Sequence, residues 1–344
     1  MTAIGVVGAG AASAATAFAL NRALDEVTVT VFEKSGGLGG RAATRRRDGV
    51  TYDYGANYVT ADDEGVTDLL TETLDTAGLV DVTDPIYTFD AAGTVSPGRD
   101  ADGHRFTYER GITQLAKRLF ARSNATVHRD TRVTALRRDG DHWHVTAGGD
   151  RWGPFDALCL NPPAPQSAAL LADAAWDAPL RADLVAALRD VAFRTCWTAV
   201  LHYPFRLERP YYALVNPEKT HDVGWVAREE CKDGHVPEGE SLLVVQAGHE
   251  WSLAHFDDPP AENAARLAAS AADVLGDDRL REPDWTDHQG WRYAQTAGEA
   301  PTALLDAAEA HGLYFLGDWT VGTARVHAAL RSGLDAAERL CRSH

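Results

Sequence analysis

Apolar and polar positions at the start of the chain predict a strand, a tight turn and a helix. Ile4, Val6 and Val7 are typical of a short buried strand, and glycines stand at positions 8 and 10 directly after it. The alanine-rich run from Ala11 onward has the composition of a helix packed closely on a sheet. Residues 27–32 then alternate with β-branched side chains. We therefore expect a βαβ unit.

The rest of the chain mixes helical and strand periods. Asp48-Gly49 is typical of a hairpin turn between residues 42–46 and 50–54. The proline-rich stretch that follows residues 155–160 predicts a domain boundary. The alternating segments CWTAVLHY, VGWVARE and SLLVVQA favour an antiparallel sheet in a second domain. The other expected elements are helices near 66–77, in 108–120, at 169–190, at 260–275 and from 326 onward, and a strand at 313–316.

Composition narrows the class of protein. The 344 residues, 45% of them apolar, are enough for about two domains. No apolar run approaches the roughly 18 residues of a membrane span, and the start of the chain lacks a basic signal segment, so we expect a cytoplasmic protein without a membrane partner. The net charge of −17 makes a nucleic-acid partner improbable and is typical of either a halophilic source or a GC-rich genome. Four cysteines without a C-x-x-C pair argue against a zinc ribbon or a disulfide framework.

The first glycine-rich turn has the spacing of a phosphate site. Gly8, Gly10 and Ser13 match G-x-G-x-x-S, in which the glycines let a pyrophosphate approach the backbone and the helix start offers free N–H groups. Glu33 stands 20 residues past Ser13, where a dinucleotide site places its acceptor for ribose hydroxyls. The ligand is therefore expected to contain adenine.

A second glycine-rich turn and a C-terminal motif extend this site. Gly39 and Gly40 again expose backbone, and Arg41 offers a planar guanidinium suited to a phosphate. The segment from Asp53 to Tyr58 contains two small residues that let a ligand approach the main chain. Near the end, Asp318 follows a strand and can accept hydrogen bonds from sugar-like hydroxyls.

Taken in this order, the motifs resemble the FAD-dependent amine oxidase superfamily, and within it the renalase group of small enzymes. The middle of the chain is similar too, in VGWVARE, in VVQAGHEWSLAH and in WRYA at residues 291–294. The resemblance implies an α/β protein with a Rossmann-like FAD-binding domain of the GR2 type and a second α+β substrate domain built on an antiparallel sheet. The implied FAD-binding domain comprises residues 1–60, 106–165 and 288–344. The implied substrate domain comprises residues 61–105 and 166–287.

Carried over position by position, the resemblance implies non-covalent FAD. The pyrophosphate would lie against the first turn and Arg41, the adenosine ribose against Glu33, the adenine against the backbone of Val133, and the ribityl chain against Asp318. Residues 55–58 would lie near the isoalloxazine. The full expected set is Gly8, Gly10, Ala11, Ala12, Glu33, Lys34, Gly39, Gly40, Arg41, Gly55, Ala56, Asn57, Tyr58, Val133, Gly317, Asp318, Val326, His327 and Ala328.

The chain departs from the family pattern in three places. Ser13 replaces the third glycine of the first turn, and His327 stands where relatives often have glycine. Gln289 and Gly290 precede Trp291, where the group commonly has a basic residue. The last departure concerns the substrate side of the site rather than the cofactor side.

The resemblance also implies the reaction. A flavin accepts a hydride at N5, here from an NAD(P)H-like dihydronicotinamide or its isomers, and O2 then takes the electrons to give H2O2. Because the donor's ring nitrogen expels the hydride, no general base is required. Aromatic side chains would then wall the site. Candidate catalytic residues are Tyr58, Trp225, His288, Trp291 and Arg292, with Trp251 and His249 considered beside them.

Other functions remain open. In an amine oxidase of the same fold, a primary or secondary amine would reduce the flavin. In a non-catalytic flavin-binding module, no substrate would reduce it. A carotenoid-type desaturase or isomerase is disfavoured because the chain is short and shows no apolar docking surface. No metal is expected, since the histidines of HEWSLAH stand six apart (His249 to His255) and would lie on different sides of a helix.

Overall fold

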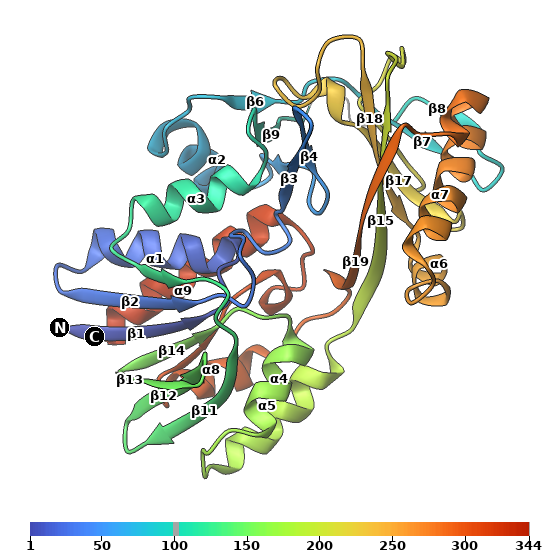
Figure 1. Ribbon diagram of the computed structural model, residues 1–344. Coiled ribbons are helices and arrows are strands. Elements are labelled where there is room, and N and C mark those ends of the chain that lie inside the picture. Colours follow the sequence, from blue (N-terminus) through green and yellow to red (C-terminus); the bar gives the residue numbers. More distant parts are fainter. Residues whose placement is uncertain (99–102, 344) are drawn as a thin grey trace.

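The computed structural model describes residues 1–98 and 103–343, and its first domain is built on a five-stranded parallel sheet with strand order β10-β2-β1-β14-β20 (Figure 1). The pairing of Val6 with Val31 on one side and with Cys159 on the other places β1 at the centre. The βαβ prediction is thereby confirmed. The strands are β1 (Thr2–Val7), β2 (Val27–Phe32), β10 (Thr126–His128), β14 (Ala157–Leu160) and β20 (Leu313–Phe315).

Helices cover one face of this sheet, and a mixed layer covers the other (Figure 1). Helix α9 lies very close to α1, because a Cβ on Gly333 would overlap the carbonyl oxygen of Ala12. Thr16 also donates to the Gly333 carbonyl at 2.9 Å. The first face holds α1 (Ala11–Ala23), α3 (Thr113–Ala121) and α9 (Val326–Ser343). The second holds β11 (Val133–Asp139), β12 (His142–Ala147), β13 (Asp150–Phe155), α4 (Ala164–Ala172), α5 (Pro179–Asp190) and α8 (Thr302–Glu309).

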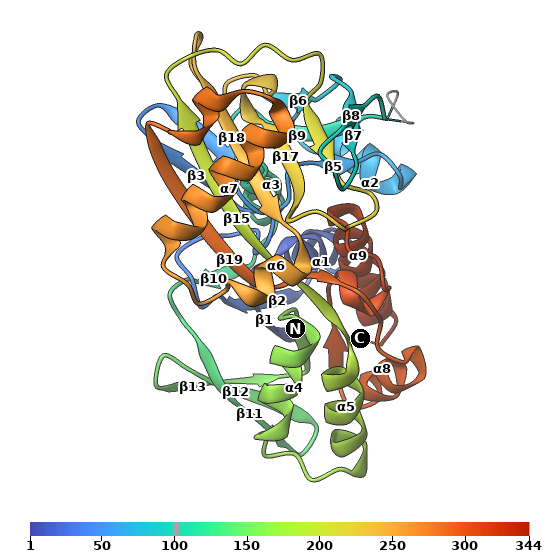
Figure 2. The same ribbon diagram turned by 90° about the vertical axis from the view of Figure 1, so that its right-hand side faces the viewer.

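The second domain is a seven-stranded sheet with order β19-β15-β18-β17-β16-β7-β8, and apart from the parallel β16–β7 pair it is antiparallel. Helices α6 (His249–Ala254) and α7 (Pro260–Leu275) cover its outer face (Figure 2). Its inner face packs toward the first domain. The strands are β7 (Ile86–Phe89), β8 (Val95–Ser96), β15 (Phe193–Tyr203), β16 (Ala213–Val215), β17 (Val223–Arg228), β18 (Ser241–Ala247) and β19 (Trp285–Thr296).

Short elements join the two domains. The predicted hairpin is confirmed, since Asp48 and Gly49 both have positive φ, at 50° and 86°, between β3 and β4. None of the helices within residues 1–98 and 103–343 has the length and apolar character needed to cross a membrane. The joining elements are β3 (Thr44–Arg47), β4 (Val50–Asp53), β5 (Val59–Thr60), β6 (Leu79–Asp81), β9 (Arg105–Tyr108) and a 3₁₀ turn at Glu229–Cys231. Helix α2 (Glu64–Asp68) and a π-helical turn (Leu69–Thr73) pack in the core of the first domain, and two further 3₁₀ turns lie beside α7 (Asp278–Arg281) and beside α9 (Asp318–Thr320).

The predicted fold class is confirmed, and two segments near the predicted domain limits pack in ways that the sequence pattern did not indicate. The helix expected at 169–190 is instead the end of α4 followed by a separate helix α5, which Pro179 begins, and both helices pack on the Rossmann-like sheet. Segment 61–105 is split, because α2 packs in the core of the first domain while β7 and β8 join the large sheet. The domain boundaries themselves stay a prediction.

Candidate active site

The first glycine turn leaves the start of α1 open. Gly8 has φ +91°, and the helix begins after Gly10 with no side-chain cap and no acidic residue in its first turn. Its N–H groups therefore carry uncompensated positive charge. The buried hydroxyl of Ser13 donates to the Gly8 carbonyl at 2.6 Å, so serine fills the third small position without an unsatisfied polar group.

The acidic residue of the fingerprint lies against this turn. Glu33 Oε2 accepts the Ala9 N–H at 2.8 Å, and Oε1 accepts both the N–H and the hydroxyl of Ser35. Thr131 N–H donates to the Glu33 carbonyl at 2.8 Å, which brings the start of β11 and the buried Val133 to the same end of the site. Lys34 is exposed beside it.

The second glycine turn touches the first. Gly39 N–H donates to the Ala9 carbonyl at 2.8 Å, and Gly39 forms an isolated bridge with Gly10. Gly40 has φ +60°, and a Cβ there would lie 3.3 Å from the Cα of Gly10. The two turns thus form one backbone surface that only small residues allow.

Arg41 and Asp318, 277 residues apart in the chain, form a bidentate ion pair. The distances are 2.6 Å from Nη2 to Oδ1 and 3.1 Å from Nη1 to Oδ2, and Nη1 also donates to the Ala294 carbonyl at 3.0 Å. Beside them α9 starts, with His327 Nδ1 2.8 Å from Thr60 Oγ1. Burial lowers the pKa of His327 although two acids lie near it.

These residues fit FAD. The open helix start and Arg41 suit a pyrophosphate, the carboxylates of Glu33 and Asp318 suit ribose and ribityl hydroxyls, and the glycine surface admits a ligand at backbone distance. The predicted pieces Gly317, Val326 and Ala328 lie next to Asp318 or at the start of α9. The roles of the individual residues remain proposals.

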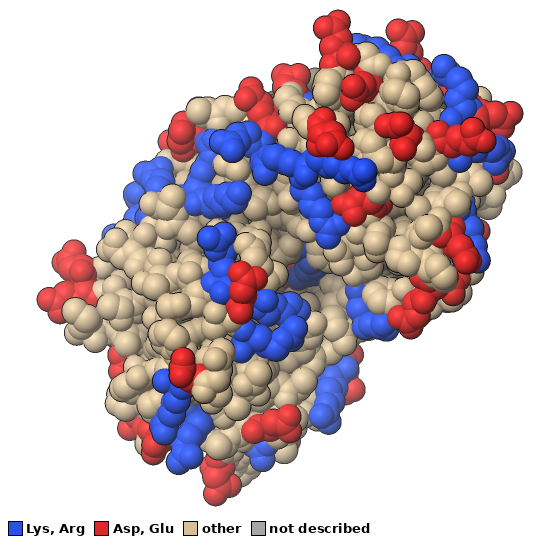
Figure 3. All heavy atoms as spheres, in the orientation of Figure 1, with Lys and Arg blue, Asp and Glu red and all other residues tan. Residues whose placement is uncertain are grey.

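Positive charge gathers on the face seen in Figure 3, over α3 and the β3–β4 hairpin and around a hollow, although the chain carries −17 overall. Burial, and then the nearby Arg46, Arg110 and Arg129, lower the pKa of Lys117. None of these four side chains has a carboxylate within 4 Å among the residues described. Clustered positive charge of this kind favours the approach of anionic ligands in general.

The segment after β4, residues 54–57, forms a loop held from both domains. Ala56 N–H donates to the Arg41 carbonyl at 2.9 Å, and a Cβ on Gly55 would overlap that same carbonyl oxygen. From the large sheet, Gln246 Nε2 donates to the Gly55 carbonyl at 2.8 Å. Trp291 Nε1 donates to the Tyr54 carbonyl at 3.2 Å.

An aromatic wall, defined here as Tyr58, Tyr212 and Trp225, stands beside this loop. Its ring centroids lie 6.1 to 6.2 Å apart. Trp225 Nε1 and the Tyr212 hydroxyl both approach Asn57 Oδ1, at 3.2 and 3.5 Å. The Tyr58 hydroxyl makes no hydrogen bond to a described residue, and burial raises its pKa, so it keeps its proton at neutral pH.

The predicted catalytic set is only partly brought together. Trp291 stacks on Tyr54 with centroids 5.5 Å apart, on the inner face of β19. His288 instead stacks on Trp197, and Arg292 lies over Phe256, both on the outer face that α6 and α7 cover. Successive strand residues point to opposite faces, so neither His288 nor Arg292 reaches the loop.

The two further candidates also lie on the outer side. Trp251 belongs to the core beneath α6 and α7, in edge contact with Trp197. His249 Nδ1 accepts the Thr195 N–H at 2.9 Å, which is a structural role. Sequence reasoning missed Tyr212, which directly precedes β16, and Gln246 on β18, which lies in a stretch cited for the resemblance but was not singled out.

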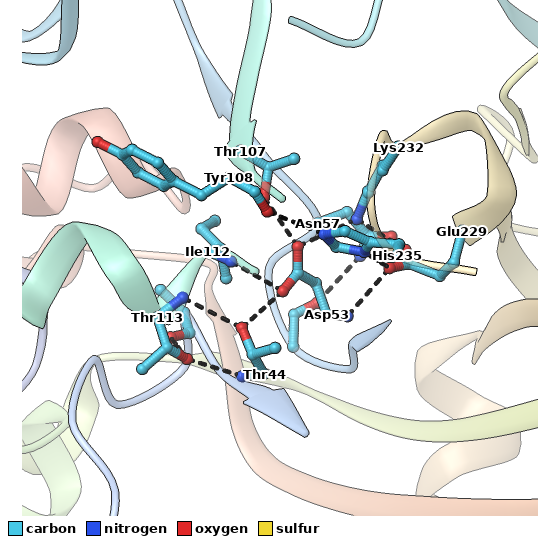
Figure 4. Close-up of polar contacts among 12 residues, drawn as sticks. Thr44, Asp53, Asn57, Thr107, Tyr108, Ile112, Thr113, Glu229, Lys232 and His235 are labelled. Atoms are coloured by element: carbon cyan, nitrogen blue, oxygen red, sulfur yellow. Dashed lines mark hydrogen bonds and ion pairs between the residues drawn. The ribbon is translucent and has the colours of Figure 1, made fainter. Parts of the chain in front are cut away.

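Sequence reasoning also missed a buried charged quartet, defined here as Asp53, Glu229, Lys232 and His235 (Figure 4). All four side chains are fully buried. Lys232 Nζ lies 3.2 Å from Asp53 Oδ2 and 2.7 Å from Glu229 Oε1. The three other residues have the spacing of metal ligands, but the ammonium already occupies the place of a cation.

The quartet is electrically neutral. His235 Nδ1 faces Glu229 Oε2 at 2.7 Å and Nε2 faces the Tyr108 carbonyl at 2.9 Å, so both nitrogens must donate. Burial acts against this charge, but the hydrogen bond and charge of Glu229 outweigh it and raise the pKa of His235. Two cations therefore balance two carboxylates.

The quartet makes stability depend on pH. Because the folded-state pKa of His235 lies above its ordinary 6.5, its stabilisation is complete below about pH 6.5 and is lost as pH rises through the folded value. Burial alone would raise the pKa of Glu229, but Lys232 and His235 outweigh it and lower this pKa below its ordinary 4.5. The stabilisation of the folded protein by the Glu229 carboxylate is therefore complete above about pH 4.5 and is lost on acidification.

We therefore expect the urea-unfolding free energies of wild type and His235→Gln to converge as pH rises from about 6 to about 9, because the wild type loses its imidazolium. The difference between the two proteins removes the contribution of other titrating groups. A difference that stays constant over this range would contradict a charged His235.

Two family models match the chain. The NAD(P)-binding Rossmann-like domain matches residues 6–73, and the flavin containing amine oxidoreductase family matches residues 98–341. Since the second match spans more than half of the chain, the protein belongs to the flavin-containing amine oxidoreductase family. It is an FAD-dependent oxidoreductase, which confirms the resemblance to the amine oxidase superfamily.

Solved structures share the fold over the whole chain. A candidate protoporphyrinogen oxidase from Exiguobacterium sp. 255-15 has a TM-score of 0.79 at 16% identity, covering 100% of this chain and 99% of that one. Cyclohexylamine oxidase from Brevibacterium oxydans IH-35A has a TM-score of 0.73 at 15% identity, and the match covers 99% of each chain. A CLA-producing fatty acid isomerase from P. acnes has a TM-score of 0.72 at 11% identity, and the match covers 98% of each chain. These chemistries differ, so the fold leaves the substrate open.

Proposed function

We propose that the protein oxidises a dihydronicotinamide of the NAD(P)H type, with FAD as hydride acceptor and O2 as final acceptor. The observation that carries this choice is the charge around the aromatic wall. Arg105 and Arg325 act on Tyr58 as nearby cations, and Asp62 is the acid that acts on it. Lys232 is also near, but its charge is balanced within the quartet.

The Arg105 charge is not neutralised locally. Its side chain is 4% exposed and donates to the carbonyls of Val82 and Asp84, and no carboxylate in the described part of the chain pairs with it. Asp62 is largely exposed and therefore screened. Such surroundings disfavour a substrate ammonium and favour a neutral ring that carries anionic phosphates.

Bound FAD supplies the acceptor position for the hydride. The protein then has two tasks, which the aromatic wall performs: it orients the substrate and it excludes water. The Tyr58 hydroxyl is free to form a hydrogen bond to a polar group of the substrate. The carboxylates of Asp53 and Glu229 lie within the neutral quartet, so neither is available as a general base. A donor whose own ring nitrogen expels the hydride needs none.

The test is anaerobic mixing of FAD-loaded protein with NADH, NADPH and their dihydro isomers, and separately with a panel of primary and secondary amines. We expect the visible flavin absorbance to be lost with a dihydronicotinamide and retained with the amines. Reduction by an amine alone would overturn the proposal. It would support the second candidate, amine oxidation, which the family match favours.

Tyr58→Phe should reveal the hydroxyl's role. We expect FAD binding to be retained and kcat/KM for the reducing dihydronicotinamide to fall by about tenfold, since one substrate hydrogen bond is lost. Tyr87→Phe, in a ring pair with Tyr211 on the large sheet, is the matched control. Equal kcat/KM in both variants would exclude a substrate contact for Tyr58.

A further inference from the structure

The quartet joins the two domains at the end of β4. Asp53 ends β4, one of the elements that join the two domains, while the other three members follow β17 of the large sheet. Two backbone bonds reinforce the junction. Asp53 N–H donates to Glu229 Oε2 at 3.1 Å, and Thr51 N–H donates to the His235 carbonyl at 2.7 Å.

The Asp53 carboxylate is saturated with donors (Figure 4). Oδ1 accepts from the Thr44 hydroxyl at 2.7 Å and from Ile112 N–H at 2.9 Å. Oδ2 accepts from the Thr107 hydroxyl at 2.9 Å and from Lys232 at 3.2 Å. A buried carboxylate with four donors is fixed in position and cannot act as a base.

The chain beyond Asp53 is the loop at residues 54–57. Gly55 follows Asp53 by two residues, and its carbonyl is bonded from the large sheet by Gln246. A shift of Asp53 would therefore move this loop relative to Trp225, which bonds Asn57. Through the quartet, the substrate domain can therefore fix the position of this loop, which is expected to lie beside the isoalloxazine.

We propose that Lys232 and Asp53 are positioning residues, which hold the loop at residues 54–57 in register with the aromatic wall and thereby set the environment of the flavin ring. The proposal rests on the proposed place of this loop beside the flavin. It does not depend on the substrate, because its readouts are properties of the bound cofactor.

The experiment uses the double variant Asp53→Asn/Lys232→Met in the full-length, FAD-loaded protein. Removing one anion and one cation keeps the buried site neutral, so folding is preserved while the ion pair that fixes the loop is lost. The matched control is Arg339→Met/Glu309→Gln, which likewise removes one cation and one anion, 2.7 Å apart, between α9 and α8. The readouts are visible circular dichroism of the bound flavin, its reduction potential and the FAD dissociation constant.

We expect the double variant to show altered flavin dichroism, a shifted potential and FAD binding weakened by about tenfold, with all three near wild type in the control. Wild-type dichroism and potential in the double variant would overturn the proposal. Thr107→Val, which removes one neutral donor from Asp53, provides a variant that keeps every charge. It should change the dichroism in the same direction, and an unchanged spectrum would again overturn the proposal.

Discussion

Lys232→Met alone is expected to destabilise the folded protein by about 3–5 kcal/mol, as is typical when one partner of a buried ion pair is removed. The Lys232 side chain is fully buried and lies within 3.2 Å of two carboxylates. Without the ammonium, Asp53 and Glu229 retain two buried negative charges against the single charge of His235. Urea unfolding at saturating FAD measures the loss.

The control for this prediction is Lys219→Met, because Lys219 is exposed and has no ion pair among the residues described. Its unfolding free energy should stay within about 0.5 kcal/mol of wild type. The charge-balanced variant Asp53→Asn/Lys232→Met should recover most of the stability that Lys232→Met loses. Wild-type stability in Lys232→Met would show that the quartet does not contribute as a charged unit.

Arg41→Met has the second largest expected effect. It leaves Asp318, whose side chain is 6% exposed, without its bidentate partner. Because the Arg41 side chain is 29% exposed, solvent screens part of the loss, and we expect the apoprotein to lose about 2 kcal/mol. The proposed pyrophosphate contact is lost as well, which should weaken FAD binding about tenfold to a hundredfold.

Two further variants separate these effects. Arg41→Met/Asp318→Asn removes the unpaired charge, so it should restore apoprotein stability without restoring the phosphate contact. Arg189→Met removes an exposed arginine on α5 that has no ion pair or side-chain hydrogen bond among the residues described, and FAD titration should give a nearly wild-type affinity. Wild-type affinity in Arg41→Met would exclude its cofactor role.

The cofactor side could be predicted from the sequence because it depends on backbone conformation. Gly8 and Gly40 have positive φ in turns that touch each other, and such positions restrict residue type strongly enough to be visible as a motif. The family resemblance implied that Arg41 and Asp318 approach one cofactor, whereas the ion pair between them was not predicted.

The substrate side was harder to predict because it depends on which face of a strand a residue occupies. Trp291 and Arg292 are neighbours on one strand, so alternation alone forbids that both face the site, a signal that the sequence did contain. The quartet carries no such signal. Its members are of residue types that usually lie on protein surfaces. Here Asp53, Lys232 and His235 are buried where the two domains meet.

A crystal structure of the FAD-bound protein would test the central claim most directly, namely that the loop at residues 54–57 and the aromatic wall enclose the reactive edge of the flavin. We expect the pyrophosphate at Gly8 and Gly10, and the isoalloxazine beside Gly55 with N5 facing Tyr58. An isoalloxazine ring that lies away from Gly55, or one whose N5 is closed off from Tyr58, would contradict this account.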